Sequence, residues 1–531
     1  MDLPSLITAL SDPQAYPHPV ARLHVVQTHA SCVFLTGEYV YKIKKPVNFG
    51  FLDYSTLERR RRCCEQELAL NRRLCPEVYL DLVPAVRQAG RLRVAVPGTP
   101  VEWAVRMRQL PEADMLPARL AAGTVTAAHL EGIAAVLAAF HARAAAGPAV
   151  AAFGAPEAVA RNVEENFAQT EHRVGDSLPA EHLAVIREYS RRFLAEHREL
   201  FHLRMREGRI RDGHGDLRAQ NLCLHPGLQP GIQVLDCIEF NDRFRYGDVA
   251  ADLAYLAMDL DLAGRADLRQ VLVDRYVQLS ADPQLRQLLP FYGCYRAYVR
   301  GKIALLTGEE AEIPAAERRS HQELAAAAFD LSRSYAERRE RPALLITVGY
   351  SGSGKSALAR ELARRLPAVH LASDAVRKEL AGVAPSASLS EAQYAAEKRG
   401  SIYAELRRRA LPHLLRGEHV LLDATFLAPA ERENAAALAA EGQAELWVVE
   451  CRCPDAVIRR RLLHRAAAPD SSDAGLAVYE AQRRDFPDAP GSDSGDAAPG
   501  RIVARTDQPA PLAARSVLRK FWKRWSDGVM E

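Results

Sequence analysis

This sequence has no long apolar segment, no secretory leader pattern and no excess of one charge. No apolar run reaches about 18 residues, so a transmembrane helix is not expected. The opening stretch MDLPSLITALSDPQ carries early acids without a basic region and an apolar block, which argues against a signal peptide and for a cytoplasmic protein. The 70 basic and 67 acidic residues leave a net charge of +3, so overall charge does not favour nucleic acid or membranes, although a local patch can.

Cysteine and lysine are both scarce. The nine cysteines form no CxxC pair, so a zinc site or a disulfide framework is not expected. Nine of the 70 basic residues are lysines and the other 61 are arginines. This bias makes each lysine informative, because arginine is used almost everywhere else. Lys42 and Lys355 deserve notice for this reason, since both lie in patterns that bind phosphate.

The pattern of apolar residues predicts several domains. A chain of 531 residues is long enough for roughly two to four of them. Strand-like runs in the first hundred residues precede long helical stretches, and from residue 342 strand-like runs alternate with helices, which is typical of a parallel sheet. We expect an N-terminal domain over 1–310 (a small lobe to about 109 and a helical lobe over 110–310), a connecting helix over 311–341, a second domain over 342–505 and a basic, aromatic tail over 506–531.

The small lobe is predicted from local patterns. Two β-rich runs around a Gly-Glu turn predict a hairpin at 33–45, and apolar spacing predicts a helix at 56–75. Further short strands are expected at 83–86, 91–96 and 101–107.

Residues 349–356 read GYSGSGKS and match the pattern GxxxxGK[ST]. They follow the strand-like run LLITV and open the helical segment SALARELARRL, as a phosphate-binding loop requires. Glycines let backbone N–H groups approach phosphate oxygens, the lysine reaches the β- and γ-phosphates, and the final serine can bind Mg²⁺. The predicted nucleotide-binding residues are Gly349, Ser351, Gly352, Ser353, Gly354, Lys355 and Ser356.

Two aspartates follow strand-like runs in the same domain. Asp374 comes directly after AVHLAS, and Asp423 lies near the end of VLLDAT. The carboxyl ends of parallel strands meet at one edge of a sheet, so both side chains should face one crevice. Asp374 can accept the proton of a substrate hydroxyl, Arg377 one turn later can hold an acidic group, and Asp423 is a candidate metal ligand beside Ser356.

A later helix carries Arg461 and Arg465 next to the Asp- and Ser-containing segment APDSSDAG. Arginines on a lid neutralise the charge that develops during phosphoryl transfer, so both are candidate catalytic residues. An ordinary solvated helix face explains the same pattern equally well in so arginine-rich a chain.

The motifs over about 342–485 resemble those of small P-loop kinases related to polynucleotide 5′-kinases, zeta-toxin-like kinases and gluconate-type kinases. The resemblance implies an ATP-dependent kinase in which Asp374 is the general base and Arg377 contacts substrate or phosphate. No sugar-specific motif and no arginine-rich channel stands out, so the acceptor stays open.

A second set of chemical residues lies in the N-terminal part. Residues 214–221 read HGDLRAQN, and Asp236 ends the run IQVLD. This is the His-x-Asp-(x)4-Asn pattern with a downstream aspartate that marks kinase-like catalytic loops. Asp216 would orient or deprotonate the acceptor hydroxyl, while Asn221 and Asp236 would hold Mg²⁺ against the nucleotide phosphates.

The remaining parts of such a site are present in order. Lys42 in VYKIKK is the expected partner of the α- and β-phosphates. The following helix offers Glu65 and Glu67 to pair with it, and the spacing favours Glu67. Residues 102–107 are expected to form a hinge that touches the adenine, and Asp252 is expected to support the catalytic loop.

Residues 1–310 resemble the aminoglycoside phosphotransferase and choline-kinase-like branch of the kinase fold, because the loop reads HGD and no DFG triplet follows. Two departures are Arg218, where this branch often has histidine, and the lack of a clear glycine-rich loop before the strands. The whole chain is similar to a bacterial fusion family described as bifunctional aminoglycoside phosphotransferase-like and P-loop ATP-binding proteins. That resemblance implies a multidomain protein with a bilobal kinase-like (α+β) domain followed by an α/β P-loop kinase domain; it does not imply an antibiotic substrate.

Three hypotheses follow for the function. The first is an enzyme with two ATP sites that transfers the γ-phosphate of ATP, with Mg²⁺, to hydroxyl groups of small molecules or to a 5′-hydroxyl. The second is a kinase-like domain that senses a ligand and controls the P-loop kinase. The third is a nucleotide-switched interaction protein. The presence of both metal ligands, Asn221 and Asp236, favours the first, while the acceptors and the oligomeric state are not predicted.

The tail is an amphipathic helix by pattern. Its apolar side chains share one helix face and basic side chains fill the rest. Such a helix suits docking onto the protein's own body, binding to nucleic acid or binding to a membrane surface, and we expect them in that order because the helix is short for membrane binding. The apolar face comprises Val517, Leu518, Phe521, Trp522 and Trp525.

Overall fold

The computed structural model describes residues 2–50, 52–175, 177–229, 231–309, 313–337, 341–384, 387, 396–465, 475–487 and 500–527. The chain divides into two compact units. Unit 1 comprises 1–168, 190–259 and 270–296, and unit 2 comprises 169–189, 260–269 and 297–531. Within the described part of the chain, no helix has the length and apolar character needed to cross a membrane.

Unit 1 begins with an antiparallel sheet of order β1-β2-β3-β6-β4-β5. The predicted hairpin is present as β2 and β3, and the three further strands are present as β4, β5 and β6. Side chains alternate between the faces of a strand, so β3 contributes Tyr41 and Ile43 to a cluster with helix α1 and Val40 to a cluster with helix α2. The bounds are α1 Leu3–Leu10, β1 His24–Gln27, β2 Ser31–Leu35, β3 Tyr39–Lys44, α2 Leu57–Asn71, β4 Tyr79–Gln88, β5 Arg91–Val94 and β6 Pro100–Arg108.

One local prediction here is wrong. Residues 102–107 were expected to form a hinge, but they lie inside β6, which pairs with β3 on one side and β4 on the other. Buried side chains recur along β6 as far as Met107, and Arg108 still pairs with β3, so the chain leaves the sheet only after Arg108. Glu102 is buried and pairs with Arg60 of α2, which fixes that helix on the sheet.

The predicted helical stretch breaks into separate helices. There are two short antiparallel strand pairs here, β7 with β10 and β8 with β9. The segment 214–221 runs from the end of β7 to the start of β8, and Asp236 follows β9. The bounds are α3 Leu116–Ala121, α4 Ala127–Arg143, α5 Pro148–Ala151, α6 Pro156–Thr170, α7 Ala180–Glu196, α8 Arg198–Arg206, β7 Ile210–Asp212, β8 Leu222–Leu224, β9 Ile232–Val234, α9 Asp242–Arg245, β10 Tyr246–Asp248, α10 Val249–Leu262, α11 Ala266–Ser280, α12 Leu285–Gly308 and α13 Ala315–Ala336.

Unit 2 contains a five-stranded sheet of order β12-β13-β11-β14-β15, and all its pairings are parallel. β11 and β13 are buried along their whole length, as expected for strands with helices on both faces. The predicted parallel sheet with crossover helices is thereby confirmed. The bounds are β11 Ala343–Val348, α14 Lys355–Arg365, β12 Ala368–Ala372, α15 Ser373–Leu380, α16 Ala396–Leu415, β13 His419–Asp423, α17 Pro429–Glu441, β14 Glu445–Arg452, α18 Asp455–Arg465, α19 Leu476–Asp485, β15 Arg501–Arg505 and α20 Ala510–Asp527.

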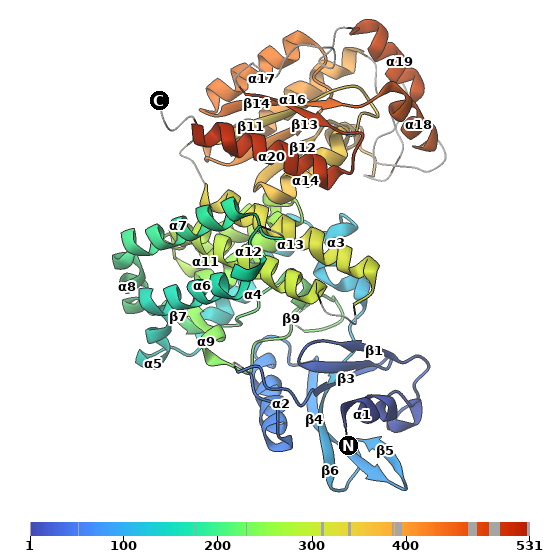
Figure 1. Ribbon diagram of the computed structural model, residues 1–531, viewed down its shortest axis with the longest axis vertical. Helices are drawn as coiled ribbons and strands as arrows, with labels where there is room; N and C mark the ends of the chain where they lie inside the picture. Colours follow the sequence, from blue (N-terminus) through green and yellow to red (C-terminus); the bar gives the residue numbers. More distant parts are fainter. Residues whose placement is uncertain are drawn as a thin grey trace. The chain divides into compact units, whose positions relative to one another are not determined.

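The tail helix α20 packs against α14 and β15, and Figure 1 shows it beside α14. Its apolar face joins the core of the sheet, where Phe521 meets the ring of Trp447. Trp522 lies edge-on to the ring of His182 on α7, and the Arg333 guanidinium of α13 lies over it. The tail therefore docks onto the protein itself, the first of the three expected arrangements; the side chain of Trp525 lies outside the described residues.

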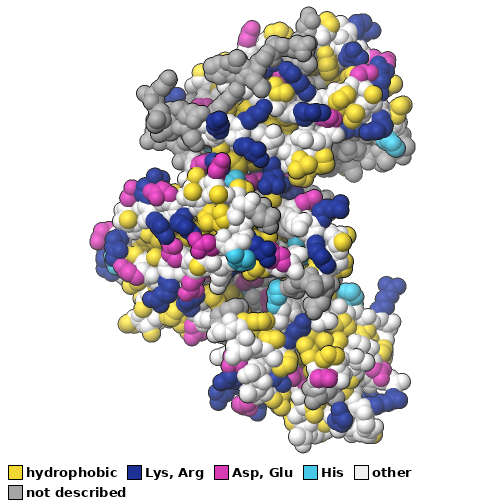
Figure 2. Space-filling view, viewed as in Figure 1, with side chains coloured by type: hydrophobic (Ala, Val, Ile, Leu, Met, Phe, Trp, Pro, Cys, Tyr) yellow, Lys and Arg dark blue, Asp and Glu magenta, His cyan; other side chains and the backbone are white. Residues whose placement is uncertain are grey.

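The helix expected as a charged connector, α13, is buried from Asp330 to Ala336. Asp330 accepts a hydrogen bond from Nε2 of His182 at 2.9 Å and one from Arg365 of α14 at 2.8 Å. These buried contacts join α7, α13 and α14 inside unit 2. On the surface, Figure 2 shows charged side chains of both signs interspersed over the visible face, in keeping with the small net charge.

Candidate active sites

The loop 349–356 connects β11 to α14, as the sequence predicts. Gly352 and Gly354 have φ of +80° and +94°, a region that favours glycine. A Cβ atom on Gly352 would lie 2.9 Å from Leu462, so a side chain there is also excluded by packing. Lys355 begins α14 and its Nζ donates to the Tyr350 carbonyl at 2.7 Å. The loop thus wraps around the helix N-terminus, where backbone N–H groups favour an anion.

A contact that the sequence did not predict covers this loop. The N–H of Ser351 donates to Oε1 of Gln482 at 2.8 Å, and Nε2 of Gln482 donates to the Ser351 hydroxyl at 3.0 Å. Gln482 belongs to α19, and Tyr350 fixes the end of the same helix by donating to the Phe486 carbonyl. A phosphate that uses the Ser351 N–H must displace Gln482. Ser353, another predicted loop residue, is buried.

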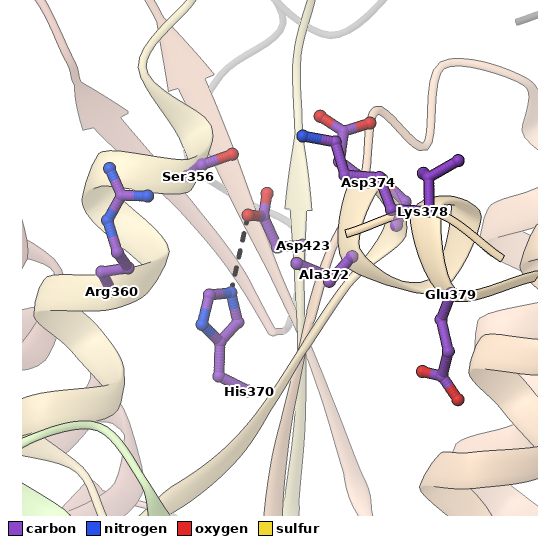
Figure 3. A pocket seen from close by; sticks show the side chains of 11 residues that line it. Ser356, Arg360, His370, Ala372, Asp374, Lys378, Glu379 and Asp423 are labelled. Carbon is purple, nitrogen blue, oxygen red and sulfur yellow. Dashed lines mark ion pairs between the residues drawn. The ribbon is translucent and has the colours of Figure 1, made fainter. Parts of the chain in front are cut away.

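A pocket of about 440 Å³ lies beside the loop at the carboxyl ends of β12 and β13. Ser356, Asp374 and Asp423 line it together, as the strand pattern predicts. Figure 3 shows Arg360 and Ser356 on one side of this pocket and Asp374 with Lys378 on the other.

The carboxylate of Asp423 is buried among polar and charged neighbours. Burial favours its neutral form, but His370, with Nε2 at 3.5 Å, the positive charge of Lys355 and a hydrogen bond with Ser356 together lower the pKa of Asp423 below its ordinary value. The carboxylate is therefore ionised beside the Ser356 hydroxyl, which is a suitable donor pair for Mg²⁺.

The predicted arginines have different surroundings. Arg377 forms an ion pair with Asp374 one turn earlier, so the two act together. Arg461 lines a second hollow of about 380 Å³ with Gly354 and donates to the Thr506 carbonyl at 2.7 Å. It does not line the pocket that contains Asp374. Arg465 ends α18, and its side chain lies outside the described residues.

The residues predicted to form a catalytic loop in unit 1 lie in one cluster. Asn221 Nδ2 donates to the Asp216 carbonyl at 2.9 Å and to its Oδ2 at 3.1 Å. The Arg218 guanidinium lies 3.2 Å from Asp216 Oδ1, so the residue that departs from the family pattern touches the candidate base.

Asp252 supports this loop by accepting hydrogen bonds from its backbone. Its carboxylate accepts the N–H groups of His214 at 2.6 Å and Gly215 at 2.9 Å. Although burial favours the neutral acid, His141, through a hydrogen bond and its charge, and the nearby Arg296 hold the pKa of Asp252 well below its ordinary value. Burial also lowers the pKa of His214, whose Nε2 lies 3.0 Å from the Leu235 carbonyl. His214 is therefore a neutral structural residue, and Asp252 supports the loop as expected.

Lys42 of β3 lies between two carboxylates. Its Nζ is 2.8 Å from Glu67 Oε1 and 2.7 Å from Asp236 Oδ1. Glu67 is thus its partner, as the spacing favoured, while Glu65 pairs with Arg61 on the surface. Asp236 has a φ of +62°, and the positive charge of Lys42 lowers the pKa of Asp236 to about 2. The unusual backbone turns an ionised carboxylate toward the lysine that is expected to bind phosphate.

Sequence reasoning assigned no role to Lys44, which lies two residues beyond Lys42 on β3, or to its partners. Lys44 is buried, lies 2.5 Å from Glu67 Oε2 and forms a second ion pair with Glu239. The Tyr54 hydroxyl donates to the same Glu239 at 2.7 Å. The scarcity of lysine, together with the two-residue spacing from Lys42, was the available signal that Lys44 shares its face of the strand.

Two families match the chain, and a curated relative matches almost all of it. The Phosphotransferase enzyme family matches residues 64–289, and the AAA domain family matches residues 344–489. An uncharacterized protein of Mycobacterium tuberculosis (strain H37Rv) is 32% identical over 479 residues, which are 88% of this chain and 92% of that protein. An uncharacterized protein of Mycobacterium bovis matches to the same extent.

The chain belongs to the family of these mycobacterial proteins. Its matches to the Phosphotransferase enzyme family and to the AAA domain family support a phosphotransferase of the ATP-dependent kinase type, as predicted. The predicted fold class, a kinase-like domain followed by a P-loop domain with a parallel sheet, is also confirmed.

Solved structures match this chain only distantly. A gluconokinase from Sinorhizobium meliloti 1021 is 18% identical with a TM-score of 0.27, covering 36% of this chain and 98% of its own. A choline/ethanolamine kinase family protein from Mesorhizobium loti is 14% identical with a TM-score of 0.37, covering 63% of this chain and 98% of its own. Likenesses this distant say nothing about the substrates of this chain.

Proposed function

We propose that the chain is a bifunctional kinase with two phosphoryl-transfer sites, each of which uses ATP with Mg²⁺ and an acceptor hydroxyl. The observation that carries the proposal is that each unit brings together a lysine, candidate metal ligands and a separate carboxylate able to serve as base. Phosphoryl transfer needs these parts because catalysis depends mainly on positioning and on neutralising charge.

In unit 1, Lys42 would bind the α- and β-phosphates, with Glu67 holding it in place. Asp216 would orient the hydroxyl of the acceptor or take its proton. Asn221 and Asp236 would hold the metal. The donor set fits Mg²⁺: the Asp236 side chain is 49% exposed, and the Asn221 amide nitrogen is committed to Asp216, which leaves its oxygen for the metal.

In unit 2, the loop Gly349–Ser356 would hold the phosphates and Lys355 would turn from the Tyr350 carbonyl to them. Ser356 and Asp423 would hold Mg²⁺, directly or through water. Asp374 would accept the acceptor proton, with Arg377 as its ion-pair partner and phosphate contact. The hollow beside Gly354 and Arg461 would take the nucleoside, which gives Arg461 a binding role in place of the lid role expected from sequence.

The acceptors are proposed only as a class. Each proposed site contains an aspartate that would accept the proton of a hydroxyl, Asp216 or Asp374, and this supports hydroxylated small molecules as acceptors for either one. A nucleic-acid 5′-hydroxyl is the alternative acceptor for unit 2. The tail helix α20 was one candidate for binding nucleic acid, but its apolar face packs into the core of unit 2.

The test is ADP release by the full chain against panels of hydroxylated metabolites, aminoglycosides and 5′-hydroxyl oligonucleotides. Lys355→Ala should remove turnover with one group of acceptors and Asp216→Asn turnover with another. If Asp216→Asn leaves all turnover intact, or alters only the response of the P-loop site to an added ligand, unit 1 is a sensor and the two-site proposal fails. If Lys355→Ala leaves all turnover intact, the unit 2 assignment fails.

A further inference from the structure

The pocket beside the P-loop is lined by three carboxylates, and each of them has positive neighbours in the protein. Asp374 forms an ion pair with Arg377. Glu379 accepts hydrogen bonds from Arg409 at 2.7 Å and 3.0 Å. The third carboxylate, Asp423, has the positive neighbours described above. The acidic side chains of this pocket are therefore compensated within the protein and do not by themselves require a cationic acceptor.

Two cations line the same pocket, and the chemistry proposed above gives neither of them a role. Arg360 belongs to α14, one turn after Ser356, and Figure 3 shows it on the same side of the pocket as that serine. Lys378 belongs to α15, lies on the side of Asp374 and is only 3% exposed. Because an arginine stays protonated at physiological pH, the pocket carries a permanent positive charge on the Arg360 side.

The guanidinium of Arg360 is available to a ligand. Its residue is exposed, and among the residues that the structure describes no carboxylate pairs with it and no acceptor forms a hydrogen bond with it. Arg364, one turn further along α14, shows the contrast, because it donates to the Leu262 carbonyl at 2.9 Å and pairs with Glu361. A planar guanidinium with unused donors can hold a carboxylate or a phosphate through two hydrogen bonds.

The volume of this pocket suits a small acceptor. About 440 Å³ lies in the range that encloses small organic ligands. The nucleoside of ATP is assigned to the separate hollow beside Gly354 and Arg461, which leaves this space to the acceptor. The candidate base Asp374 and the guanidinium of Arg360 lie on opposite sides of it. One small molecule can therefore present a hydroxyl to the first and an anionic group to the second.

We propose that the acceptor of unit 2 is a small hydroxylated anion: Arg360 binds its carboxylate or phosphate group while Asp374 faces its hydroxyl. This inference rests on the phosphoryl transfer proposed for unit 2. In that step the hydroxyl oxygen bonds to the γ-phosphorus of ATP, the bond from this phosphorus to the β,γ-bridging oxygen breaks, and ADP keeps the electron pair. The proton of the hydroxyl passes to Asp374.

Arg360 serves this reaction through its charge. An anionic acceptor approaches the negative phosphates of ATP, and like charges repel strongly in a site that is partly shielded from water. The charge of Arg360 offsets this repulsion on the acceptor side, and Lys378 adds positive potential across the pocket. The same two charges disfavour a polycation, such as an aminoglycoside, as the acceptor of unit 2.

The experiment measures ADP release by the full chain, with Asp216→Asn as background so that only unit 2 transfers phosphate. Its probes are acceptors matched in size that differ in charge: glycerate with glycerol, gluconate with sorbitol, glucose 6-phosphate with glucose, and an aminoglycoside as the cation. We expect an anionic member to be used with a kcat/KM at least about tenfold above that of its neutral counterpart, since it gains a charged hydrogen-bond partner. The carboxylate and phosphate pairs then tell which anion fits.

Variants of Arg360 test its part directly. Arg360→Gln should raise the KM for the anionic acceptor roughly tenfold or more and change the KM for ATP by less than about threefold. Arg360→Lys should recover part of the affinity, because it keeps the charge without the planar fork. Arg408→Gln removes an arginine of α16 that is 72% exposed outside this pocket, and it serves as the matched control with both KM values unchanged.

Several results would overturn the inference. If the neutral or cationic acceptors are preferred in a reaction that Lys355→Ala abolishes, the inference fails and the proposed function stands. An equal rise in KM for both members of a pair in Arg360→Gln would mean that Arg360 only shapes the pocket, and a rise in the KM for ATP alone would make it a nucleotide contact. If Lys355→Ala leaves ADP release intact with every acceptor, the proposed unit 2 site itself fails.

Discussion

Replacing Trp522 by alanine tests how firmly α20 is built into unit 2. The side chain is 3% exposed, and its ring contacts His182 with a centroid distance of 5.2 Å and the Arg333 guanidinium at 4.5 Å. Truncating a buried tryptophan costs about 3–5 kcal/mol, and a desolvated cation–π contact is worth about 0.5–2 kcal/mol. Since such terms do not simply add, we expect a loss of at least about 3 kcal/mol in the stability of unit 2.

Hydrogen exchange measured by mass spectrometry can follow this loss without assuming that the whole chain unfolds in one step. Peptides from β11 report the opening of the core, because this strand is buried along its whole length. A loss of about 3 kcal/mol corresponds to exchange roughly 150-fold faster. Lys523 is exposed on the same helix, so Lys523→Ala should change exchange by less than about threefold.

The reasoning is refuted if Trp522→Ala accelerates β11 exchange by less than about fivefold, or no more than Lys523→Ala does. Deleting residues 513–531 should act in the same direction as Trp522→Ala and leave retention on oligonucleotides and anionic vesicles unaltered. A salt-sensitive loss of oligonucleotide binding on that deletion would instead give the tail a nucleic-acid role.

Four further outcomes are expected. Asp374→Asn should slow transfer by unit 2 by roughly 10²–10⁴ with little change in ATP affinity, measured by single-turnover kinetics; a loss of affinity alone would make Asp374 a structural or metal residue. Asp216→Asn should abolish transfer by unit 1 but keep Mg·ATP binding in calorimetry, and retained turnover would exclude it as the base. Gln482→Ala should lower KM for ATP at the P-loop site a few-fold by freeing the Ser351 N–H, whereas a higher KM would mean that Gln482 supports the loop. Burial opposes the charge of Asp330, but His182 and Arg365 lower the pKa of Asp330 below its ordinary value. The contribution of this carboxylate to stability is therefore complete above about pH 4 and is lost as the pH falls below that. The difference in β11 protection between the native chain and Asp330→Asn should shrink from about pH 5 to about pH 3.

Parts of the site that depend on local sequence could be predicted. The loop Gly349–Ser356 lies between a strand and a helix, and Asp374 and Asp423 follow parallel strands, so their convergence follows from the fold pattern alone. The Lys42–Glu67 pair could be predicted because the kinase-like pattern fixes both elements.

Contacts between distant segments could not be predicted in the same way. Gln482 meets Ser351 from more than a hundred residues away, and Glu239 meets Lys44 across an even longer separation. No periodicity in either segment encodes these partners, because packing of whole elements brings them together. The hinge was misplaced for a related reason: the strand pattern of β6 extends beyond residue 107, and strand pairing decides where it ends.

The docking of α20 also bears on how the chain is made. The side chain of Trp522 packs on His182, a residue synthesised more than three hundred positions earlier. The P-loop sheet acquires β15 and α20 only after every other strand has left the ribosome. Until then the apolar surfaces of α14 and β14 that these elements cover stay open to solvent, and such surfaces favour association between nascent chains. Because α20 completes this core, the P-loop domain can finish folding only after translation has passed residue 522 and the helix has emerged from the ribosome.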